Sequence, residues 1–281
     1  MKKIFLIGAI VIFIIALLFF LFFSQDHRNP EVTFLDVGQG DSVLIEAPQG
    51  QNILIDGGPD KKIMYSLGSA LPFWERKIDL VILSHSHADH VTGLISVLKR
   101  FKVKKVLYNG ENADSAVYKK FLQLARKKSE LELVKNKKVV KTGNNCRLKI
   151  IPPTREIFRI DNSNNASLVS RLSCRGVSVL FAGDIEKERE ERILTRDLKL
   201  KSDILKVAHH GSDTSNSKKF LKEVSPQAAV IQVGVDNDKG HPSSRIIKRL
   251  ERLGVKIFRN DQAGSVEFLL QKDGIRPVFL P

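Results

Sequence analysis

The chain opens with a long apolar stretch and continues as short apolar runs separated by amphipathic segments. Residues 4–23 carry no charge and follow Lys2 and Lys3. As a helix rising about 1.5 Å per residue they would be about 30 Å long, which matches the hydrocarbon core of a bilayer. A cleaved signal peptide has an apolar core of about 7–15 residues that ends in small side chains, whereas this stretch ends in Leu21, Phe22 and Phe23. The pattern predicts a retained transmembrane helix, with residues 1–23 as a membrane anchor.

The charges beside this stretch predict how the rest of the chain lies. Lysines next to a span favour the cytoplasmic side of the membrane, so Lys2 and Lys3 place the amino terminus there. Residues 24–30 form a short polar linker, and residues 31–281 form one domain. We expect that domain to be extracytoplasmic.

The domain has strand patterns in two sets, with helical patterns after each set. The strand patterns, separated by glycine-rich turns, cover residues 32–36, 42–47 and 52–55 and later 147–151, 167–173 and 177–181. Helical periodicity covers residues 92–101, 116–127, 217–224 and 243–253. This order predicts an α/β protein in which two sheets pack face to face with helices on the outside.

The densest candidate chemistry follows an apolar strand at residues 80–83. His85, His87, Asp89 and His90 lie within six residues. Side chains two apart on a strand share a face, and the later pair can reach a second point where the chain turns into a helix. Imidazole and carboxylate ligands suit zinc, manganese or iron. The spacing predicts a hydrolytic site for one or two metal ions, the alternative being a solvated polar loop.

Three more apolar runs end in residues of the same types. Asp56 precedes Gly57, Asp184 follows Gly183, and His209 and His210 follow Ala208. Because strand ends converge on one rim of a sandwich, these side chains can meet the histidine cluster. Asp184 can bridge two cations, and either His209 or His210 can complete the ligands of the second ion. Asp56 is expected to orient a ligand histidine.

Other polar positions have both a functional and a structural interpretation. His241 precedes a helix and could donate a proton to a leaving group, bind substrate or cap a turn. Asp36 and Asp41 flank a glycine-rich turn that could wall the site. Ser212 could contact a substrate phosphate, whereas Lys206 is expected on the solvated surface.

The composition adds a possible partner and an open question. The formal net charge is +15, and basic clusters occupy residues 99–105, 119–120, 126–128 and 135–138. Such clusters attract DNA, other anionic polymers or anionic lipid, although they could also be ordinary solvated lysines. Cys146 and Cys174 lie in apolar segments and could be a disulfide or two buried thiols.

These motifs, in this order, resemble the metallo-β-lactamase superfamily, and more closely the hydrolase domain of ComEC-type competence proteins of DNA uptake. The segments that carry the resemblance are residues 35–42, 54–58, 84–90, 165–169, 183–184, 205–212 and 240–242. The resemblance covers about residues 32–270 and implies a four-layer αββα sandwich. It implies His85, His87 and Asp184 at one metal, and Asp89, His90, Asp184 and a histidine of the 209–210 pair at the other.

Two departures from the family pattern matter. The usual third histidine is absent from residues 162–167, where Asn165 or a water could fill its place, so oxygen donors make Mn²⁺ as well as Zn²⁺ a candidate. ComEC-type proteins also have many membrane spans and a DNA channel, whereas this chain has one apolar stretch. It cannot form a channel alone, so any channel partner is a separate protein.

Together these observations predict a membrane-anchored, extracytoplasmic metal-dependent hydrolase that uses metal-bound water. Asp89, Asp184 and His241 are the candidate catalytic residues. The expected substrate is a DNA phosphodiester in a competence role. The alternatives are a phosphorylcholine-esterase-like or lactonase-like hydrolase of the same fold, and a non-catalytic, membrane-tethered DNA-binding subunit.

Overall fold

The computed structural model describes residues 2–24, 29–143, 145–154, 162–196, 198–235 and 237–279. Residues 25–28 of the predicted linker lie outside this part. Helix α1 (Lys2–Ser24) covers the predicted apolar helix, and within it the side chains of residues 7, 8 and 10–19 are described. In the described part of the chain, no helix is long and apolar enough to cross a membrane. The membrane span therefore stays a prediction.

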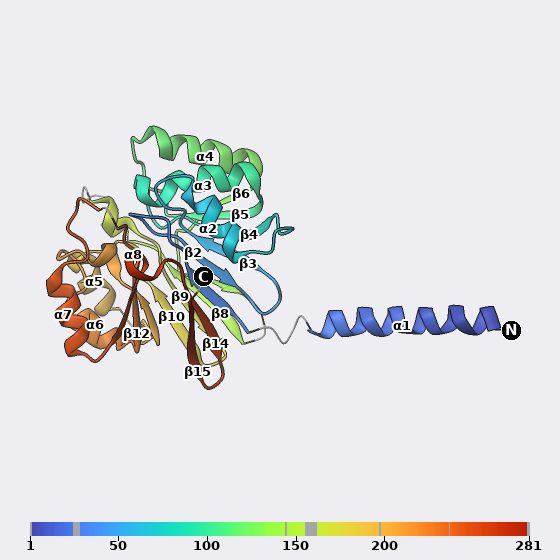
Figure 1. Ribbon diagram of the computed structural model, residues 1–281. Helices are drawn as coiled ribbons and strands as arrows, with labels where there is room; N and C mark the ends of the chain where they lie inside the picture. Colours follow the sequence, from blue (N-terminus) through green and yellow to red (C-terminus); the bar gives the residue numbers. More distant parts are fainter. Residues whose placement is uncertain are drawn as a thin grey trace.

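Two sheets form the body of the domain (Figure 1). Among the described residues, the first sheet has eight strands in the order β15-β14-β1-β2-β3-β4-β5-β6, and the second has seven in the order β13-β12-β11-β10-β9-β8-β7. The first comprises β1 (Glu31–Phe34), β2 (Val43–Glu46), β3 (Asn52–Ile55), β4 (Lys77–Ile82), β5 (Lys102–Tyr108), β6 (Glu130–Leu133), β14 (Val266–Gln271) and β15 (Gly274–Phe279). The second comprises β7 (Lys138–Lys141), β8 (Cys146–Ile151), β9 (Val169–Cys174), β10 (Val177–Phe181), β11 (Ile204–Lys206), β12 (Ala228–Ile231) and β13 (Lys256–Arg259).

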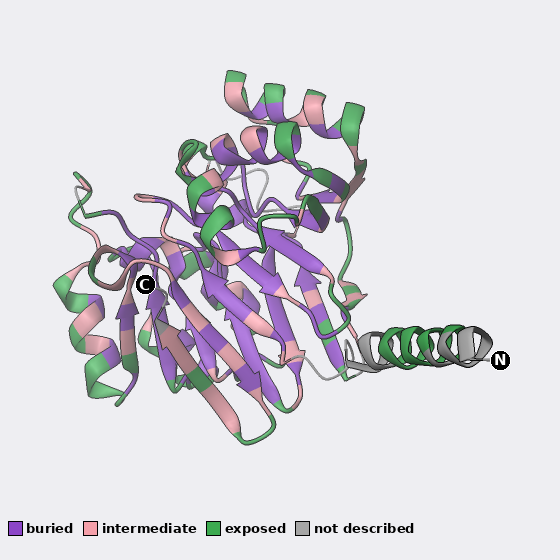
Figure 2. Cartoon of the chain, turned by 45° about the vertical axis from the view of Figure 1, so that its right-hand side comes forward, coloured by how far each residue is buried: buried purple, intermediate pink, exposed green. Residues whose placement is uncertain are grey.

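Helices cover the outer face of each sheet. Those on the first sheet are α2 (Lys62–Ala70), α3 (Ala88–Arg100) and α4 (Ala116–Lys128); those on the second are α5 (Lys187–Leu194), α6 (Lys218–Val224) and α7 (Ser244–Arg252). Short helices η3 (Ser163–Ala166), η4 (Ala208–Gly211) and α8 (Asn260–Ala263) lie in loops. The strands are mostly buried, whereas the helices keep an exposed face (Figure 2).

Alternation along the strands divides the apolar residues among three cores. Val32 and Ile53 point between the sheets, where they join Val179 and Val230 of the second sheet. The next residue along, Leu54, points outward under α2 and α3, and Leu180 points outward under α5. Because successive side chains on a strand face opposite ways, both sheets bury both faces. The predicted αββα sandwich is confirmed.

The parallel strands bring the predicted site residues to one edge. Strands β3, β4, β5 and β6 are parallel neighbours, as are β10, β11, β12 and β13. The carboxyl ends of β4, β10 and β11 therefore lie at the same edge of the sandwich, followed by the residue 85–90 segment, Asp184 and the 209–210 pair. Strand β14 returns to pair with β1, and β15 pairs with β14, which the strand patterns did not indicate.

The structure answers the question of the two cysteines. Cys146 of β8 and Cys174 of β9 are directly opposite in the strand register and form a disulfide. Sequence spacing left this pairing open because only the strand pairing brings the two residues together.

Candidate metal centre

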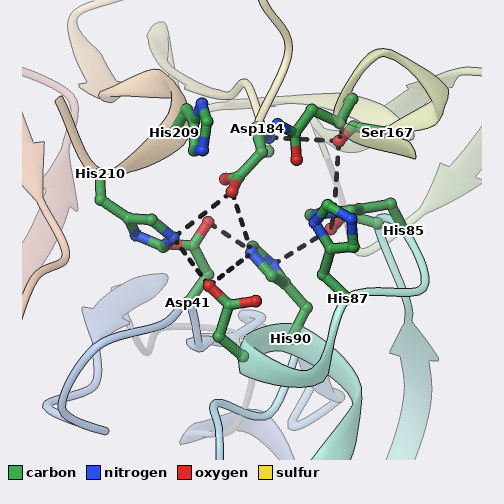
Figure 3. Close-up of polar contacts among 12 residues, drawn as sticks. Asp41, His85, His87, His90, Ser167, Asp184, His209 and His210 are labelled. Atoms are coloured by element: carbon green, nitrogen blue, oxygen red, sulfur yellow. Dashed lines mark hydrogen bonds and ion pairs between the residues drawn. The ribbon is translucent and has the colours of Figure 1, made fainter. Parts of the chain in front are cut away.

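The edge of the sandwich gathers carboxylates and imidazoles from segments far apart in the sequence (Figure 3). Four donor atoms form one group: Asp89 Oδ2, His90 Nε2, Asp184 Oδ2 and His210 Nε2. His90, Asp184 and His210 are buried, and Asp89 is partly exposed. We call this group the four-donor position.

The separations within the four-donor position suit a tetrahedral ion. His90 Nε2 lies 3.2 Å from Asp184 Oδ2 and 3.8 Å from Asp89 Oδ2. His210 Nε2 lies 3.2 Å from Asp89 Oδ2 and 3.4 Å from Asp184 Oδ2. Ligands at about 2.0–2.2 Å from a tetrahedral ion are about 3.3–3.6 Å apart. The four side chains thus fit a divalent ion with little rearrangement.

Asp56 fixes the orientation of His90, as the sequence predicted. Its Oδ2 lies 2.9 Å from His90 Nδ1, and its carboxylate also accepts hydrogen bonds from the backbone nitrogen and hydroxyl of Ser84. Gly57 lets helix α3 start beside this carboxylate, because a Cβ there would lie 2.6 Å from the Leu94 nitrogen. The carboxylate leaves His90 Nε2 free to face the group, a common support for a metal-binding histidine.

The structure distinguishes the two adjacent histidines. His210 is buried, and its Nδ1 lies 2.8 Å from the carbonyl oxygen of Gln232, so that Nε2 faces the four-donor position. His209 is partly exposed and lies 3.2 Å from the Thr214 hydroxyl. Both residues have φ near +50°. That left-handed conformation is costly outside glycine and tends to persist at functional sites.

Lys206 lies at the centre of the site and not on the surface, so that expectation was wrong. Its side chain is buried and forms ion pairs with Asp41 and with Asp184 Oδ1, the latter at 3.4 Å. It also donates to the carbonyl oxygen of Gly183 at 3.1 Å. Every residue of β11 is buried between two parallel strands, so a lysine at the end of this strand cannot reach solvent.

Two further imidazoles form a second group beside the first. His85 Nε2 and His87 Nδ1 face each other at 3.1 Å. His85 is buried and His87 is exposed. Among the described residues, the two groups of at least three close donor atoms contain neither histidine. We call His85 and His87 the two-imidazole position.

Known proteins with the same sequence pattern identify the family. Residues 35–235 match the sequence model of the metallo-beta-lactamase superfamily. The chain belongs to the metallo-beta-lactamase superfamily. Members of this superfamily are metal-dependent hydrolases, and the predicted resemblance is confirmed.

Relatives in this superfamily include competence proteins. ComE operon protein 3 of Bacillus subtilis is 32% identical over 256 residues, which cover 85% of this chain and 33% of that protein. Competence protein ComA of Neisseria gonorrhoeae is 30% identical over 258 residues, which cover 89% of this chain and 34% of that protein. The chain therefore spans about a third of the length of these relatives. The crystal structure of the metallo-beta-lactamase fold protein YhfI of Bacillus subtilis superposes on this chain with a TM-score of 0.57 at 12% identity. The superposition covers 89% of this chain and 100% of that chain.

The superfamily's usual third histidine is absent, and the structure shows the contacts of two residues in that stretch. Asn165 is buried, and its Oδ1 accepts a hydrogen bond from the Glu186 nitrogen at 2.9 Å, so it is already engaged. The Ser167 hydroxyl lies 3.4 Å from His85 Nδ1, whereas the other ring nitrogen, Nε2, is the one that faces His87. Sequence reasoning overlooked Ser167, Ser84 and Gln232, although Ser84 and Ser167 lie inside the motifs that carry the family resemblance.

Four other predicted residues take different places. Asp41 lies inside the centre, with Oδ1 3.3 Å from His210 Nδ1. Asp36 lies outside it, because its Oδ1 accepts from the Gly38 nitrogen and pairs with Lys62 at 2.8 Å. A role of Asp36 in walling the site stays a prediction. Ser212 contacts the Thr214 hydroxyl at 3.1 Å within its own turn. His241 lies nearby, with its ring 5.5 Å from that of His209.

Burial and charge shift the pKa values of the metallo-beta-lactamase centre strongly. Burial alone would lower the pKa of His90, but Asp184 and other carboxylates outweigh it and raise this pKa well above its usual value. The same balance raises the pKa of His210. Burial favours the neutral form of Asp184, yet His210, His90 and Lys206 hold its pKa well below the usual range. A divalent ion at His90 and His210 would take the place of their protons, so its binding should release protons.

His85 and His241 have shifts of the opposite sense. Burial, with the nearby charge of His90, lowers the pKa of His85 well below its usual value. Burial, with the charges of His210 and His209, lowers the pKa of His241 to about 4. Both imidazoles are therefore neutral near pH 7. His241 can then form a hydrogen bond to a substrate, but as a neutral group it is a weak proton donor.

Proposed function

We propose that this chain is a membrane-anchored, extracytoplasmic phosphodiesterase that cleaves DNA in a competence role with one or two Zn²⁺ or Mn²⁺ ions. The observation that carries the proposal is the four-donor position, whose separations of 3.2–3.8 Å suit a divalent ion. The complete donor set also counts against a non-catalytic DNA-binding subunit.

The residues around the proposed ion have separate roles. When bound, the ion would lower the pKa of a water molecule and neutralise charge that develops on oxygen. Lys206 balances the buried charges of Asp41 and Asp184, and Asp56 holds His90 in place. Asp89 is the partly exposed member of the group, and His241 is placed to bind a substrate oxygen.

Support for a DNA substrate comes from relatives and from charge. Two relatives are named ComE operon protein 3 and competence protein ComA. The net charge of +15 favours binding of a polyanion such as DNA.

Support for the location comes from α1 and from the disulfide. Residues 4–23 carry no charge, and Ile12, Phe13 and Phe19 of α1 are each more than 60% exposed in this structure. Disulfides such as Cys146–Cys174 persist in oxidising compartments. Both features suit an anchored domain outside the cytoplasm.

The test is a metal and substrate panel on the full chain in detergent. Metal-free protein is reloaded with Zn²⁺ or Mn²⁺ and offered single- and double-stranded DNA, a phosphorylcholine ester and a lactone. We expect DNA cleavage that Asp184→Asn abolishes and Asp273→Asn, in the exposed β14–β15 turn, leaves intact. Cleavage of another ester with DNA intact would favour the phosphorylcholine-esterase-like or lactonase-like alternative. DNA binding without metal and without hydrolysis would favour the binding subunit.

A further inference from the structure

The end of the sandwich opposite the metal centre is where the chain arrives from α1. Strand β1 begins there at Glu31 and runs toward Asp36 and Asp41. Asn29, the first described residue after α1, accepts a hydrogen bond at 2.6 Å from Arg175 in the turn between β9 and β10. The β14–β15 turn, at the bottom of Figure 1, lies at the same end. We call this end the entry pole.

An exposed aromatic pair lies at the entry pole. Phe73 and Trp74 are 79% and 69% exposed and pack edge to face with ring centroids 4.8 Å apart. They lie in the loop between α2 and β4, just before β4 begins at Lys77. Exposed Arg76 follows, and its carbonyl oxygen accepts a hydrogen bond from the Lys102 nitrogen, which ties the loop to the start of β5. Aromatic side chains flanked by cations are typical of the membrane–water interface.

A basic groove lies at the same pole, on the outer face of the second sheet. Its volume is ≈ 1020 Å³, and its basic lining residues are Lys141, Arg147, Lys149, Arg171, Lys199 and Lys201. Among the described lining residues the acid is Asp203, whose carboxylate already accepts from the Ser178 nitrogen and from Gln227. The Arg171 guanidinium is held by neutral oxygens, including the Lys201 carbonyl at 2.6 Å. The groove therefore presents a concentrated positive charge.

The sequence clusters of lysine do not account for this charge. Lys105 pairs with Glu130 and Glu132, and Lys138 also pairs with Glu132. The groove instead combines cations from three parts of the chain. These are Lys141, Arg147 and Lys149 of the paired strands β7 and β8, Arg171 of β9, and Lys199 and Lys201 before β11.

We propose that the entry pole docks on an anionic lipid surface, with the groove binding lipid phosphates and Phe73 and Trp74 at headgroup level. The inference rests on the anchor in the proposed function, since it is the anchor that holds this pole near lipid. Lysine and arginine near an anionic bilayer are attracted within a Debye length, about 10 Å at moderate salt. Docking turns the metal centre away from the membrane. A nucleic acid is the weaker candidate occupant, because the groove is at the end opposite the metal centre.

Trp74 is the chain's one tryptophan and reports on docking without a label. The full chain is placed in nanodiscs of zwitterionic lipid, or of zwitterionic and anionic lipid mixed, with shallow brominated acyl chains as quenchers. We expect the Trp74 emission to shift to the blue and to be quenched in anionic discs. The triple variant Arg147→Glu, Lys199→Glu and Lys201→Glu should lose both effects. The matched variant Lys120→Glu, Arg126→Glu and Lys127→Glu, on exposed positions of α4, should keep them.

The outcomes separate docking from anchoring. If the chain leaves the discs in a high-salt wash, the anchor is contradicted and docking with it. If it stays but Trp74 emission is the same in both lipids, docking alone is wrong. Docking is also overturned if a phosphorothioate single-stranded DNA, and not anionic lipid, shifts the emission in a way that the groove variant abolishes.

Discussion

The two ligand positions of the metal centre lie side by side but differ in what surrounds them. The four-donor position combines two carboxylates with two imidazoles and is supported by Asp56 and Lys206. The two-imidazole position has buried His85 and exposed His87, and the superfamily's usual third histidine is absent from residues 162–167. Negative ligand charge attracts a divalent ion strongly, so the difference implies that the first ion binds at the four-donor position.

The largest expected effect comes from comparing the neighbours His210 and His209. We expect His210→Ala to lower activity by roughly 10³-fold, the upper range for loss of one preorganised group, because it removes a donor atom. His209→Ala should change activity by less than about tenfold, since His209 lies outside the four-donor position. Steady-state rates at saturating metal measure both. Equal losses would contradict the assignment of His210.

The next effect separates buried from exposed charge. Lys206→Met leaves the buried carboxylates of Asp41 and Asp184 without a cation, and removing one partner of a buried pair costs about 3–5 kcal/mol. Lys105→Met is the matched control, because Lys105 also pairs with two carboxylates but on the surface; it should cost less than about 1 kcal/mol. Urea unfolding of metal-free protein gives both free energies. Similar values would show that Lys206 is not essential to the centre.

A smaller effect tests the support of His90. Asp56→Asn keeps the shape but removes the charge that holds His90 Nδ1, so metal affinity should fall by about 10–100-fold. Competition with a chelator measures the affinity, and Asp36→Asn, which lies outside the centre, is the control. An unchanged affinity would mean that the hydrogen bond does not orient a ligand.

The smallest effect should come from His87. Its side chain is exposed and lies in the weaker position, so His87→Ala should leave the tighter-binding ion in place and lower activity by less than about tenfold. Calorimetric titration before and after the change counts the ions. Loss of the tighter ion would reverse the order of the two positions.

Much of the secondary structure could be predicted from the sequence, because strands and helices each leave a local pattern of apolar residues. The strand patterns at residues 52–55 and 177–181 agree with β3 and β10, and the helical pattern at 116–127 agrees with α4. The return of β14 to β1, with β15 paired to β14, was not predicted. Periodicity indicates that a segment is a strand, but its partner depends on contacts between distant residues.

The site was predicted unevenly for the same reason. Asp56 lies where the sequence predicted, since the parallel pairing of β3 with β4 places it beside His90. The prediction for Lys206 was wrong, because the parallel strands on either side of β11 bury its side chain. Asp36 lies outside the four-donor position, because its Oδ1 contacts the Gly38 nitrogen and Lys62.

By itself the sequence determined the ligand types, the order of the motifs and the absence of a histidine at residues 162–167. These properties follow from the residue types and their order, and they do not depend on contacts between distant parts of the chain. Only the tertiary structure decided that His210 and not His209 faces Asp184, that Lys206 supplies the buried positive charge, and that the cations of the groove gather at the entry pole. Each of these depends on which strands pair and how the chain turns at their ends, where distances of a few ångströms separate a ligand from a neighbour.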